Sequence, residues 1–345
     1  MEPMRDGRFS WPAMRANAAA ESATPKSEQA MRIGVQMDPI QEIAIQGDTS
    51  FALLLEAQAR GFETWWFLPQ DVFWDRGLVR AHARQIKLMD RQGAHFVELA
   101  QETLDLGHFD VVLIRQDPPF DIGYVANTYL LDLAAGDTLI VNRPSGVRNI
   151  PEKLSILAFD DLIAPTFVGR NVAAIQAFAA DFDEVVLKPA FLSGGTGVVR
   201  ASAKDASFVP RVQAMLTELG KEPLVVQEFL PAVTAGDKRI MVLDGQAVAA
   251  LRRVPKAGEF RANIHVGGRA EASELTARDL EIVARVAPLL HAEGIVFAGL
   301  DIIDGRLTEI NVTSPTLVRE LQRLAGIDVP ALFWDKVQAR RAVRV

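Results

Sequence analysis

The stretch FAGLDIIDGRLTEINVTSP, residues 297–315, has the pattern of two apolar strands joined at an Asp-Gly dipeptide. It also carries Asp301, Glu309 and Asn311 among its isoleucine, leucine and valine residues. Glu309 and Asn311 are two positions apart, so within a strand their side chains face the same side of the sheet. Whether Asp301 faces that side too depends on how the two strands pair.

The apolar residues of this hairpin predict its pairing. Leu300 and Ile310 share one buried face only if residue 300 lies opposite 310 and Asp301 lies opposite Glu309. That pairing predicts a three-residue loop, 304–306, with a bulge at its glycine. All three polar side chains then face one side, where oxygen ligands completed by phosphate oxygens suit Mg²⁺. The alternative is an amphipathic hairpin whose polar face is in solvent.

Composition limits the classes of protein that remain. The chain has 345 residues, enough for more than one domain, and 49% of them are apolar, which excludes a disordered chain. Its net charge of −7 argues against nucleic-acid binding. No apolar run approaches the roughly 20 residues of a membrane-spanning helix, so we expect no membrane partner.

The chain contains no cysteine, which excludes disulfides and thiolate metal sites and is compatible with the cytoplasmic location that we expect. Its five histidines lack metal-ligand spacing, so a zinc enzyme is not expected. Residues 1–30 have no apolar core of a secretory signal. We expect them to form a disordered extension, with the fold beginning near Met31.

The pattern of elements changes midway along the chain. Strands at 31–37, 62–68, 109–116 and 138–144, with a helix at 48–61, predict an α/β first domain. The later segments predict antiparallel hairpins and single helices, which is an α+β pattern. These segments are a hairpin at 184–202, a helix at 210–220, a strand at 223–231, a hairpin at 237–255 and a helix at 274–294.

A glycine-rich loop follows Lys188. In such a loop, backbone N–H groups can approach phosphate oxygens, and the lysine adds positive charge. The loop is not a Walker A loop, because the sequence G-x-x-x-x-G-K-[ST] does not occur. It is not a dinucleotide-binding loop either, because a predicted strand rather than a helix follows it. The alternative is an ordinary hairpin turn rich in glycine.

Two basic segments follow. Arg239, at the start of a predicted strand, could stabilise a transferring phosphate or an oxyanion, or belong to a solvated run of charges. The loop 256–269 combines glycines with Lys256, Arg261 and Arg269. We expect a lid that shields a reactive intermediate, the alternative being a surface loop.

The order of these motifs resembles that of ATP-grasp ligases. More narrowly, the segments VQMDPI, DTSFALLLEAQARG, IRQDPPFD, VNRP and EINVTSPT resemble the bacterial glutathione synthetase family from Met31 to about residue 340. The resemblance implies an ATP-grasp fold, α/β plus α+β. Its parts would be an N-terminal substrate-binding domain at 31–150, a central subdomain at 151–231 and a C-terminal subdomain with the metal site at 232–340.

The resemblance also implies the reaction. ATP would phosphorylate the C-terminal carboxylate of γ-glutamylcysteine, and the amine of glycine would then displace phosphate to give glutathione and ADP. The implied cofactors are ATP and Mg²⁺ or Mn²⁺. The implied partners are these small molecules and further copies of the chain in a homotetramer.

Site residues are implied by the same resemblance. The lysines and the 193–197 loop would bind phosphates, residues 227–230 adenine, and Asp237 the ribose side. The ATP residues are Lys153, Lys188, Ser193, Gly194, Gly195, Thr196, Gly197, Gln227, Glu228, Phe229, Leu230 and Asp237. The catalytic residues would be Arg239 and Arg261, and the metal ligands Asp301, Glu309 and Asn311. The substrate residues would be Arg115, Asp117, Asn142 and Arg319.

One motif departs from the family. Residues 191–197 read F-L-S-G-G-T-G, whereas the family loop is closer to D-G-M-G-G or Y-G-N-G-G. Two other functions remain open: another ATP-grasp carboxylate–amine ligase, such as a D-alanine or glutamate-adding ligase, and an ATP-binding regulatory protein. The segment RQDPPFD in the first domain favours glutathione synthetase.

Overall fold

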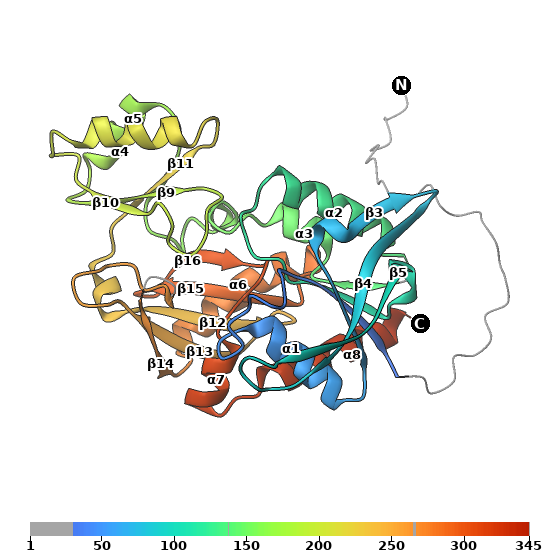
Figure 1. Ribbon diagram of the computed structural model, residues 1–345. Helices are drawn as coiled ribbons and strands as arrows, with labels where there is room; N and C mark the ends of the chain where they lie inside the picture. Colours follow the sequence, from blue (N-terminus) through green and yellow to red (C-terminus); the bar gives the residue numbers. More distant parts are fainter. Residues whose placement is uncertain (1–29, 137, 265–266, 345) are drawn as a thin grey trace, which may run out of the picture.

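The computed structural model describes residues 30–136, 138–264 and 267–344. The predicted N-terminal extension, 1–30, lies outside these residues apart from Ala30. Across the described ranges, the strands form three sheets (Figure 1). No helix in these ranges is long and apolar enough to cross a membrane.

The first sheet has the order β3-β4-β2-β1-β6-β7, with β5 paired to β4. Its strands are β1 Arg32–Gln36, β2 Glu63–Phe67, β3 Val72–Asp75, β4 Leu78–Leu88, β5 Phe96–Asp105, β6 Val111–Ile114 and β7 Leu139–Val141. Strands β2, β1, β6 and β7 are parallel, and β3, β4 and β5 pair antiparallel. The strand order reverses between β1 and β6, so their carboxyl ends border the crevice where open α/β sheets bind ligands.

Three helices accompany this sheet: α1 Thr49–Ala59, α2 Ile122–Ala134 and α3 Pro144–Asn149. Helix α1 begins at Asp48, whose side chain accepts a hydrogen bond from the Phe51 N–H at 2.6 Å. Helix α2 begins in the same way at Asp121. Both helices therefore begin directly after the loops that follow the carboxyl ends of β1 and β6.

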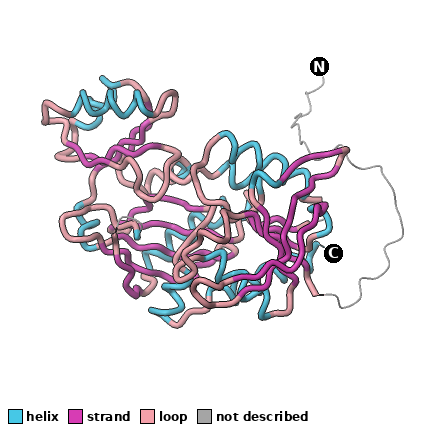
Figure 2. Tube along the Cα trace, viewed as in Figure 1, coloured by secondary structure: helices cyan, strands magenta, loops and turns pink. Residues whose placement is uncertain are grey.

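The second sheet forms a lobe of its own, at the upper left of Figures 1 and 2. Its order is β10-β9-β11-β8, all antiparallel. The strands are β8 Thr166–Gly169, β9 Val185–Pro189, β10 Val199–Ala201 and β11 Leu224–Glu228. Helices α4 Val172–Ala179 and α5 Phe208–Glu218 pack on one face, so the lobe has a separate hydrophobic core.

The third sheet has the order β14-β13-β12-β15-β16. Its strands are β12 Asp237–Leu243, β13 Gln246–Val254, β14 Arg269–Ser273, β15 Phe297–Ile303 and β16 Arg306–Asn311. Three helices follow its strands: α6 Ala277–Ala292, α7 Val318–Ala325 and α8 Val329–Arg344. Helix α8 packs on α1, and Trp334 Nε1 donates to the Leu53 carbonyl at 2.7 Å. The first and third sheets consequently share one hydrophobic core.

The β15–β16 hairpin has the predicted pairing but not the predicted loop. Leu300 lies opposite Ile310 and Asp301 opposite Glu309. The turn consists of two residues, Asp304 and Gly305, with φ of 50° and 68°, so the three-residue loop was wrong. The extra residue is Thr308 in β16, where the pairing shifts. A bulge inside the strand thus restores the pairing that the apolar pattern requires.

Candidate functional site

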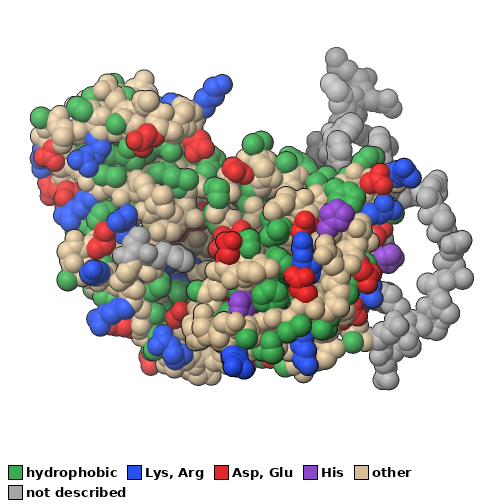
Figure 3. Space-filling view, viewed as in Figure 1, with side chains coloured by type: hydrophobic (Ala, Val, Ile, Leu, Met, Phe, Trp, Pro, Cys, Tyr) green, Lys and Arg blue, Asp and Glu red, His purple; other side chains and the backbone are tan. Residues whose placement is uncertain are grey.

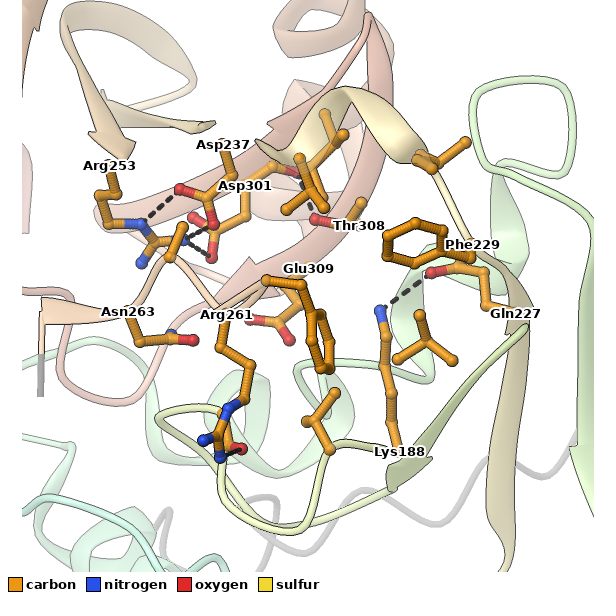
Figure 4. A pocket seen from close by; sticks show the side chains of 18 of the residues that line it. Lys188, Gln227, Phe229, Asp237, Arg253, Arg261, Asn263, Asp301, Thr308 and Glu309 are labelled. Atoms are coloured by element: carbon orange, nitrogen blue, oxygen red, sulfur yellow. Dashed lines mark hydrogen bonds and ion pairs between the residues drawn. The ribbon is translucent and has the colours of Figure 1, made fainter. Parts of the chain in front are cut away.

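A pocket lies between the second and third sheets (Figure 4). It contains about 660 Å³ of space free of protein atoms, part of it open to solvent. Figure 3 shows the surface hollowed between the upper-left lobe and the rest of the molecule. Strands β9 and β11 supply one wall, strands β12, β13, β15 and β16 supply the other, and the segment 260–263 closes one side.

One end of the pocket is apolar. Val186, Phe229, Val233, Phe260 and Ile303 line it, and the Phe229 and Phe260 rings meet edge to face with centroids 6.1 Å apart. The predicted adenine-hinge residues, Gln227 to Leu230, line the same end as β11 finishes. A flat heteroaromatic ring fits such an environment, with backbone groups of the hinge available to it.

Lys188 lies on β9 and points into the pocket (Figure 4). Its Nζ donates to Gln227 Oε1 at 2.9 Å, and Gln227 Nε2 donates to Thr166 Oγ1 at 2.9 Å. Burial lowers the pKa of Lys188, and the nearby carboxylate of Glu309 opposes that effect. Among the described residues Lys188 forms no ion pair, so an anion such as phosphate would stabilise its charge.

Lys153 follows α3 and is buried. Its Nζ donates to Glu152 Oε1 at 3.0 Å and to the Leu192 carbonyl, and lies 3.8 Å from Glu309 Oε1. Burial acts against its charge, but Glu309 and Glu152 outweigh burial and raise the pKa of Lys153. Lys153 therefore joins the glycine loop to the third sheet.

The glycine loop needs its glycines. Gly194, Gly195 and Gly197 have φ of 65°, 80° and 69°, a region that residues with a Cβ rarely adopt. A Cβ on Gly195 would lie 2.7 Å from Asn263 Oδ1. Within the loop, the Thr196 N–H donates to the Ser193 carbonyl at 3.1 Å.

The described part of the predicted lid packs against this loop. Arg261 Nη1 donates to the Gly195 carbonyl at 3.4 Å, and its Nη2 pairs with Glu259 at 2.7 Å. Arg261 and Asn263 also line the pocket between the second and third sheets. Two residues of the predicted lid, His265 and Val266, lie outside the described residues.

Glu309 points into the pocket from β16 (Figure 4). Burial, with the nearby charge of Glu152, raises its pKa to about 8. Asn311 Nδ2 donates to the Gly299 carbonyl at 3.3 Å, and its Oδ1 accepts no hydrogen bond from the described residues. These two oxygen-bearing groups fit a hard divalent cation that shares phosphate oxygens. Over the described ranges, no group of three or more His, Cys, Asp or Glu side chains could hold a metal ion by itself.

Asp301 is engaged by two arginines. It accepts two hydrogen bonds from Arg239, with Nη2 at 2.9 Å from Oδ2, and a third from Arg253 Nη2 at 2.8 Å. These guanidinium groups outweigh burial and hold the pKa of Asp301 well below its usual range. In this structure Asp301 is therefore the counter-ion of Arg239. It lies opposite Glu309 in the hairpin, but its carboxylate is bonded to arginines, whereas the carboxylate of Glu309 points into the pocket.

Arg253 was absent from the predicted site. It makes two hydrogen bonds of 2.6 Å with Asp237 as well as its bond to Asp301. Asp237 and Asp301 both line the pocket (Figure 4). Arg253 therefore links the predicted ribose-side residue to the counter-ion of Arg239.

Arg115 lies at the carboxyl end of β6, is buried and does not line the pocket between the second and third sheets. Its Nε donates to Ser50 Oγ at 2.9 Å and its Nη2 to the Pro315 carbonyl at 3.0 Å. Burial lowers its pKa, against the charges of Asp117 and Asp48. Within the described part of the chain, neither acid comes within ion-pair distance of it.

Further polar groups surround Arg115 in the crevice between β1 and β6. The backbone N–H of Asp117 donates to Asp38 Oδ2 at 2.8 Å. The Tyr124 side chain is 1% exposed, and its hydroxyl has no hydrogen-bond partner among the described residues. Among the described residues, two acids, Asp48 and Asp117, act on the single guanidinium of Arg115.

Two predicted substrate residues have other partners. The Asn142 amide donates to the Phe297 and Val312 carbonyls at 2.7 Å and accepts from the Val296 and Phe297 N–H groups at 2.9 Å. These four bonds use the amide to join the first and third sheets and leave it no donor or acceptor for a substrate. Arg319 pairs with Asp90 at 2.9 Å and does not line the pocket between the second and third sheets.

Comparisons with known proteins give two family matches. Residues 31–148 match the prokaryotic glutathione synthetase N-terminal domain, and residues 152–326 match the prokaryotic glutathione synthetase ATP-grasp domain. The glutathione synthetase of Rhodopseudomonas palustris is 45% identical over 312 residues, which cover 90% of this chain and 99% of that protein.

Solved structures share the fold at lower identity. D-cycloserine synthetase DcsG has a TM-score of 0.66 and 16% identity, over 90% of this chain and 99% of that one. The ATP-grasp ligase PsnB, complexed with a minimal precursor, Mg and ADP, has a TM-score of 0.57 and 20% identity, over 90% and 98%. The predicted ATP-grasp fold is confirmed.

Proposed function

The chain belongs to the prokaryotic glutathione synthetase family, and on this basis we propose that it joins γ-glutamylcysteine to glycine at the expense of ATP. It is an ATP-grasp ligase of glutathione synthesis. The observation that carries the proposal is the position of Glu309, which lines the pocket together with Lys188 and lies 3.8 Å from the Nζ of a second buried lysine, Lys153.

The proposed reaction has two steps. A carboxylate oxygen of the cysteinyl residue attacks the γ-phosphorus of ATP, and the bond to the β-phosphate oxygen breaks, releasing ADP. The amine nitrogen of glycine then attacks the acyl carbon, and phosphate leaves with the electron pair of the C–O bond. The amine loses a proton as the peptide bond forms.

The nucleotide would lie with adenine at the apolar end of the pocket, near Phe229 and Phe260. Its phosphates would reach Lys188, Lys153 and the backbone N–H groups of the 193–197 loop. The ribose would lie near Asp237, which Arg253 holds in place. The polar contacts would join the phosphates and the ribose hydroxyls of ATP to groups that the pocket already orients.

The donor set fits a divalent cation, which we propose to be Mg²⁺ or Mn²⁺. Glu309 and Asn311 would hold it, with Asp301 beside them. A cation there would neutralise charge on the transferred phosphoryl group. It would also stabilise the ionised form of Glu309, whose pKa burial raises to about 8.

Two arginines are proposed as catalytic residues. Arg239, held by its bonds to Asp301, would contact the oxyanion of the tetrahedral intermediate. Arg261 contacts the Gly195 carbonyl and lines the pocket, so its charge would reach the phosphoryl group. Both side chains lose little conformational freedom when the substrate binds, since protein groups already hold them.

The γ-glutamyl end of the substrate would lie in the crevice of the first domain. Its α-carboxylate would accept hydrogen bonds from the free N–H groups of Arg115. Its α-ammonium group would lie near Asp38 and Asp117, two acids that form no ion pair among the described residues. A zwitterionic head group thus matches the charges present.

Other ATP-grasp ligases are less well supported. D-cycloserine synthetase shares the fold at 16% identity, whereas the N-terminal family match covers the domain that would bind the first substrate. The intact lysines and Glu309 disfavour a regulatory protein without turnover. A cytoplasmic location and a homotetramer remain proposals from family resemblance.

An ADP-release assay tests the proposed substrates. We expect ADP release with γ-glutamylcysteine plus glycine at least about a hundredfold faster than with pairs of D-alanine, because only the former presents a γ-glutamyl head group to Arg115. Mass spectrometry should identify glutathione in an amount equal to ADP. Faster turnover with D-alanine would reject the proposed substrates while keeping the ligase fold.

A further inference from the structure

A second, smaller pocket adjoins the phosphate side of the nucleotide pocket. It has about 320 Å³ free of protein atoms, part of it open to solvent. Its apolar lining comes from three separate segments of the chain. The main lining residues are Pro118, Phe120, Val147, Ile150, Phe191 and Leu192.

One wall of this pocket lies next to the residues that we propose for phosphoryl transfer. Glu152 lines it and pairs with Lys153 Nζ at 3.0 Å. Lys153 in turn lies 3.8 Å from Glu309 and donates to the Leu192 carbonyl. The pocket therefore begins next to the groups proposed to hold the reacting carboxylate and the γ-phosphate.

The opposite wall leads to the crevice of the first domain. Pro118 follows Asp117 directly, and Phe120 contacts Tyr124 with ring centroids 5.1 Å apart. Thr313 also lines the pocket, and its neighbour Ser314 donates to the Arg115 carbonyl at 3.4 Å. The pocket thus lies between Arg115 and the Lys153–Glu309 pair.

The lining suits a small apolar group and not an anion. The Phe120 and Phe191 rings are stacked, with centroids 6.3 Å apart and an interplanar angle of 23°. Glu152 is already paired with Lys153, which leaves no cation on the pocket wall for a carboxylate or phosphate. Thiol and thioether sulfur atoms make favourable contacts with such aromatic rings.

We propose that this pocket receives the side chain of the residue whose carboxylate is phosphorylated, and that Phe120 and Phe191 select this side chain by its size and apolar character. The inference rests on the proposed function, since it needs the head group at Arg115 and the reacting carboxylate near Lys153. The side chain branches from the carbon next to that carboxylate, so it falls between the two. Glycine, the acceptor, has no side chain to place there.

Dipeptide analogues test the pocket. The wild-type chain should use γ-glutamyl-aminobutyrate, whose ethyl group matches CH₂SH in size, within about threefold of γ-glutamylcysteine in kcat/KM. It should use γ-glutamylalanine about tenfold less well, because one heavy atom is missing from an apolar pocket. The γ-glutamylserine analogue should also be about tenfold worse, because the mainly apolar lining removes water from its hydroxyl, which costs more than removing water from a thiol.

Substituting the rings should remove this selection. In Phe191→Ala and Phe120→Ala we expect the ratio of kcat/KM for cysteine over alanine to fall to about twofold, with the KM for ATP within twofold of wild type. Phe178→Ala, which truncates a partly buried ring in the separate core of the second lobe, is the matched control and should keep the wild-type ratio.

An unchanged ratio in both pocket variants would overturn the inference, as would a change confined to the KM for glycine. If one variant does not fold, the other decides. A wild-type chain that uses none of the γ-glutamyl dipeptides would overturn the proposed function and this inference with it. An active wild type without altered selection in the variants would overturn the pocket alone.

Discussion

At the scale of single residues, Lys188 and Glu309 carry opposite charges, and burial disfavours the charged form of each. Burial lowers the pKa of the lysine and raises that of the glutamate to about 8. Phosphates would stabilise the charge of the first and a divalent cation that of the second. We propose one explanation for the burial of both groups, which is that a metal-bound nucleotide lies between them and stabilises both charges.

Glu309→Gln tests that explanation. The amide keeps the shape of the side chain but removes the negative charge that the cation needs, so kcat for ADP release should fall more than about a hundredfold. The midpoint of urea unfolding should stay near that of wild type. Glu281→Gln, on the exposed face of α6, is the control and should keep full activity. Wild-type activity in Glu309→Gln would exclude Glu309 as a metal ligand.

The sequence predicted the polar groups of the site better than their partners. Glu309 and Asn311 follow from strand alternation, since alternation is a local property. Arg253 does not, because a symmetric hairpin turning at 244–245 would put Arg252 opposite Asp237. A shift in pairing between Met241 and Val242 brings Arg253 there instead. Such bulges leave no clear signal in the local pattern.

At the scale of elements, amphipathic segments with clear ends could be predicted, and polar edge strands could not. Helices α1, α5 and α6 lie where their apolar periodicity predicts them. Strand β5 was not predicted, because it is largely exposed and its sequence alternates weakly. The two-residue turn at Asp304-Gly305 could not be predicted from the local sequence, because it depends on the bulge at Thr308.

The start of α6 gives a prediction that depends on pH. Asp279 accepts from Lys238 Nζ at 2.6 Å and from the Thr276 N–H at 2.8 Å. Burial acts against its charge, but these bonds outweigh burial and lower its pKa. Since the folded pKa lies below the unfolded value of about 3.9, the stabilisation is present above that value and is lost as the pH falls through the folded pKa.

Asp279→Asn should therefore lower the free energy of unfolding by about 1–3 kcal/mol at pH 7, and the difference from wild type should shrink between pH 5 and pH 3. Urea unfolding across this range measures it. Asp161→Asn, in an exposed pair with Arg285, should change nothing measurable. A difference that is independent of pH would exclude the carboxylate as the cause.

At the scale of the whole molecule, the first and third sheets act as one body because they share a core and the bonds of Asn142. The family resemblance implied a substrate role for Asn142. Its actual partners could not be predicted from the sequence, because they lie far from it in the chain. We expect Asn142→Ala to lower the free energy of unfolding by about 3 kcal/mol or more, as buried backbone groups lose their partners.

Steady-state kinetics of the folded fraction complete this test. The KM for γ-glutamylcysteine should stay within twofold of wild type in Asn142→Ala, because the amide holds sheets together and has no group left for substrate. A stably folded variant with a KM raised tenfold or more would return Asn142 to the substrate site.

The path of a carboxylate oxygen tests the central claim most directly. γ-Glutamylcysteine labelled with ¹⁸O in its cysteinyl carboxylate should transfer one labelled oxygen to each phosphate released, because the acyl C–O bond breaks when glycine attacks. Mass spectrometry of the phosphate should then show one ¹⁸O per glutathione formed. Unlabelled phosphate, formed together with glutathione, would contradict phosphorylation of the carboxylate at the Lys153–Lys188–Glu309 site.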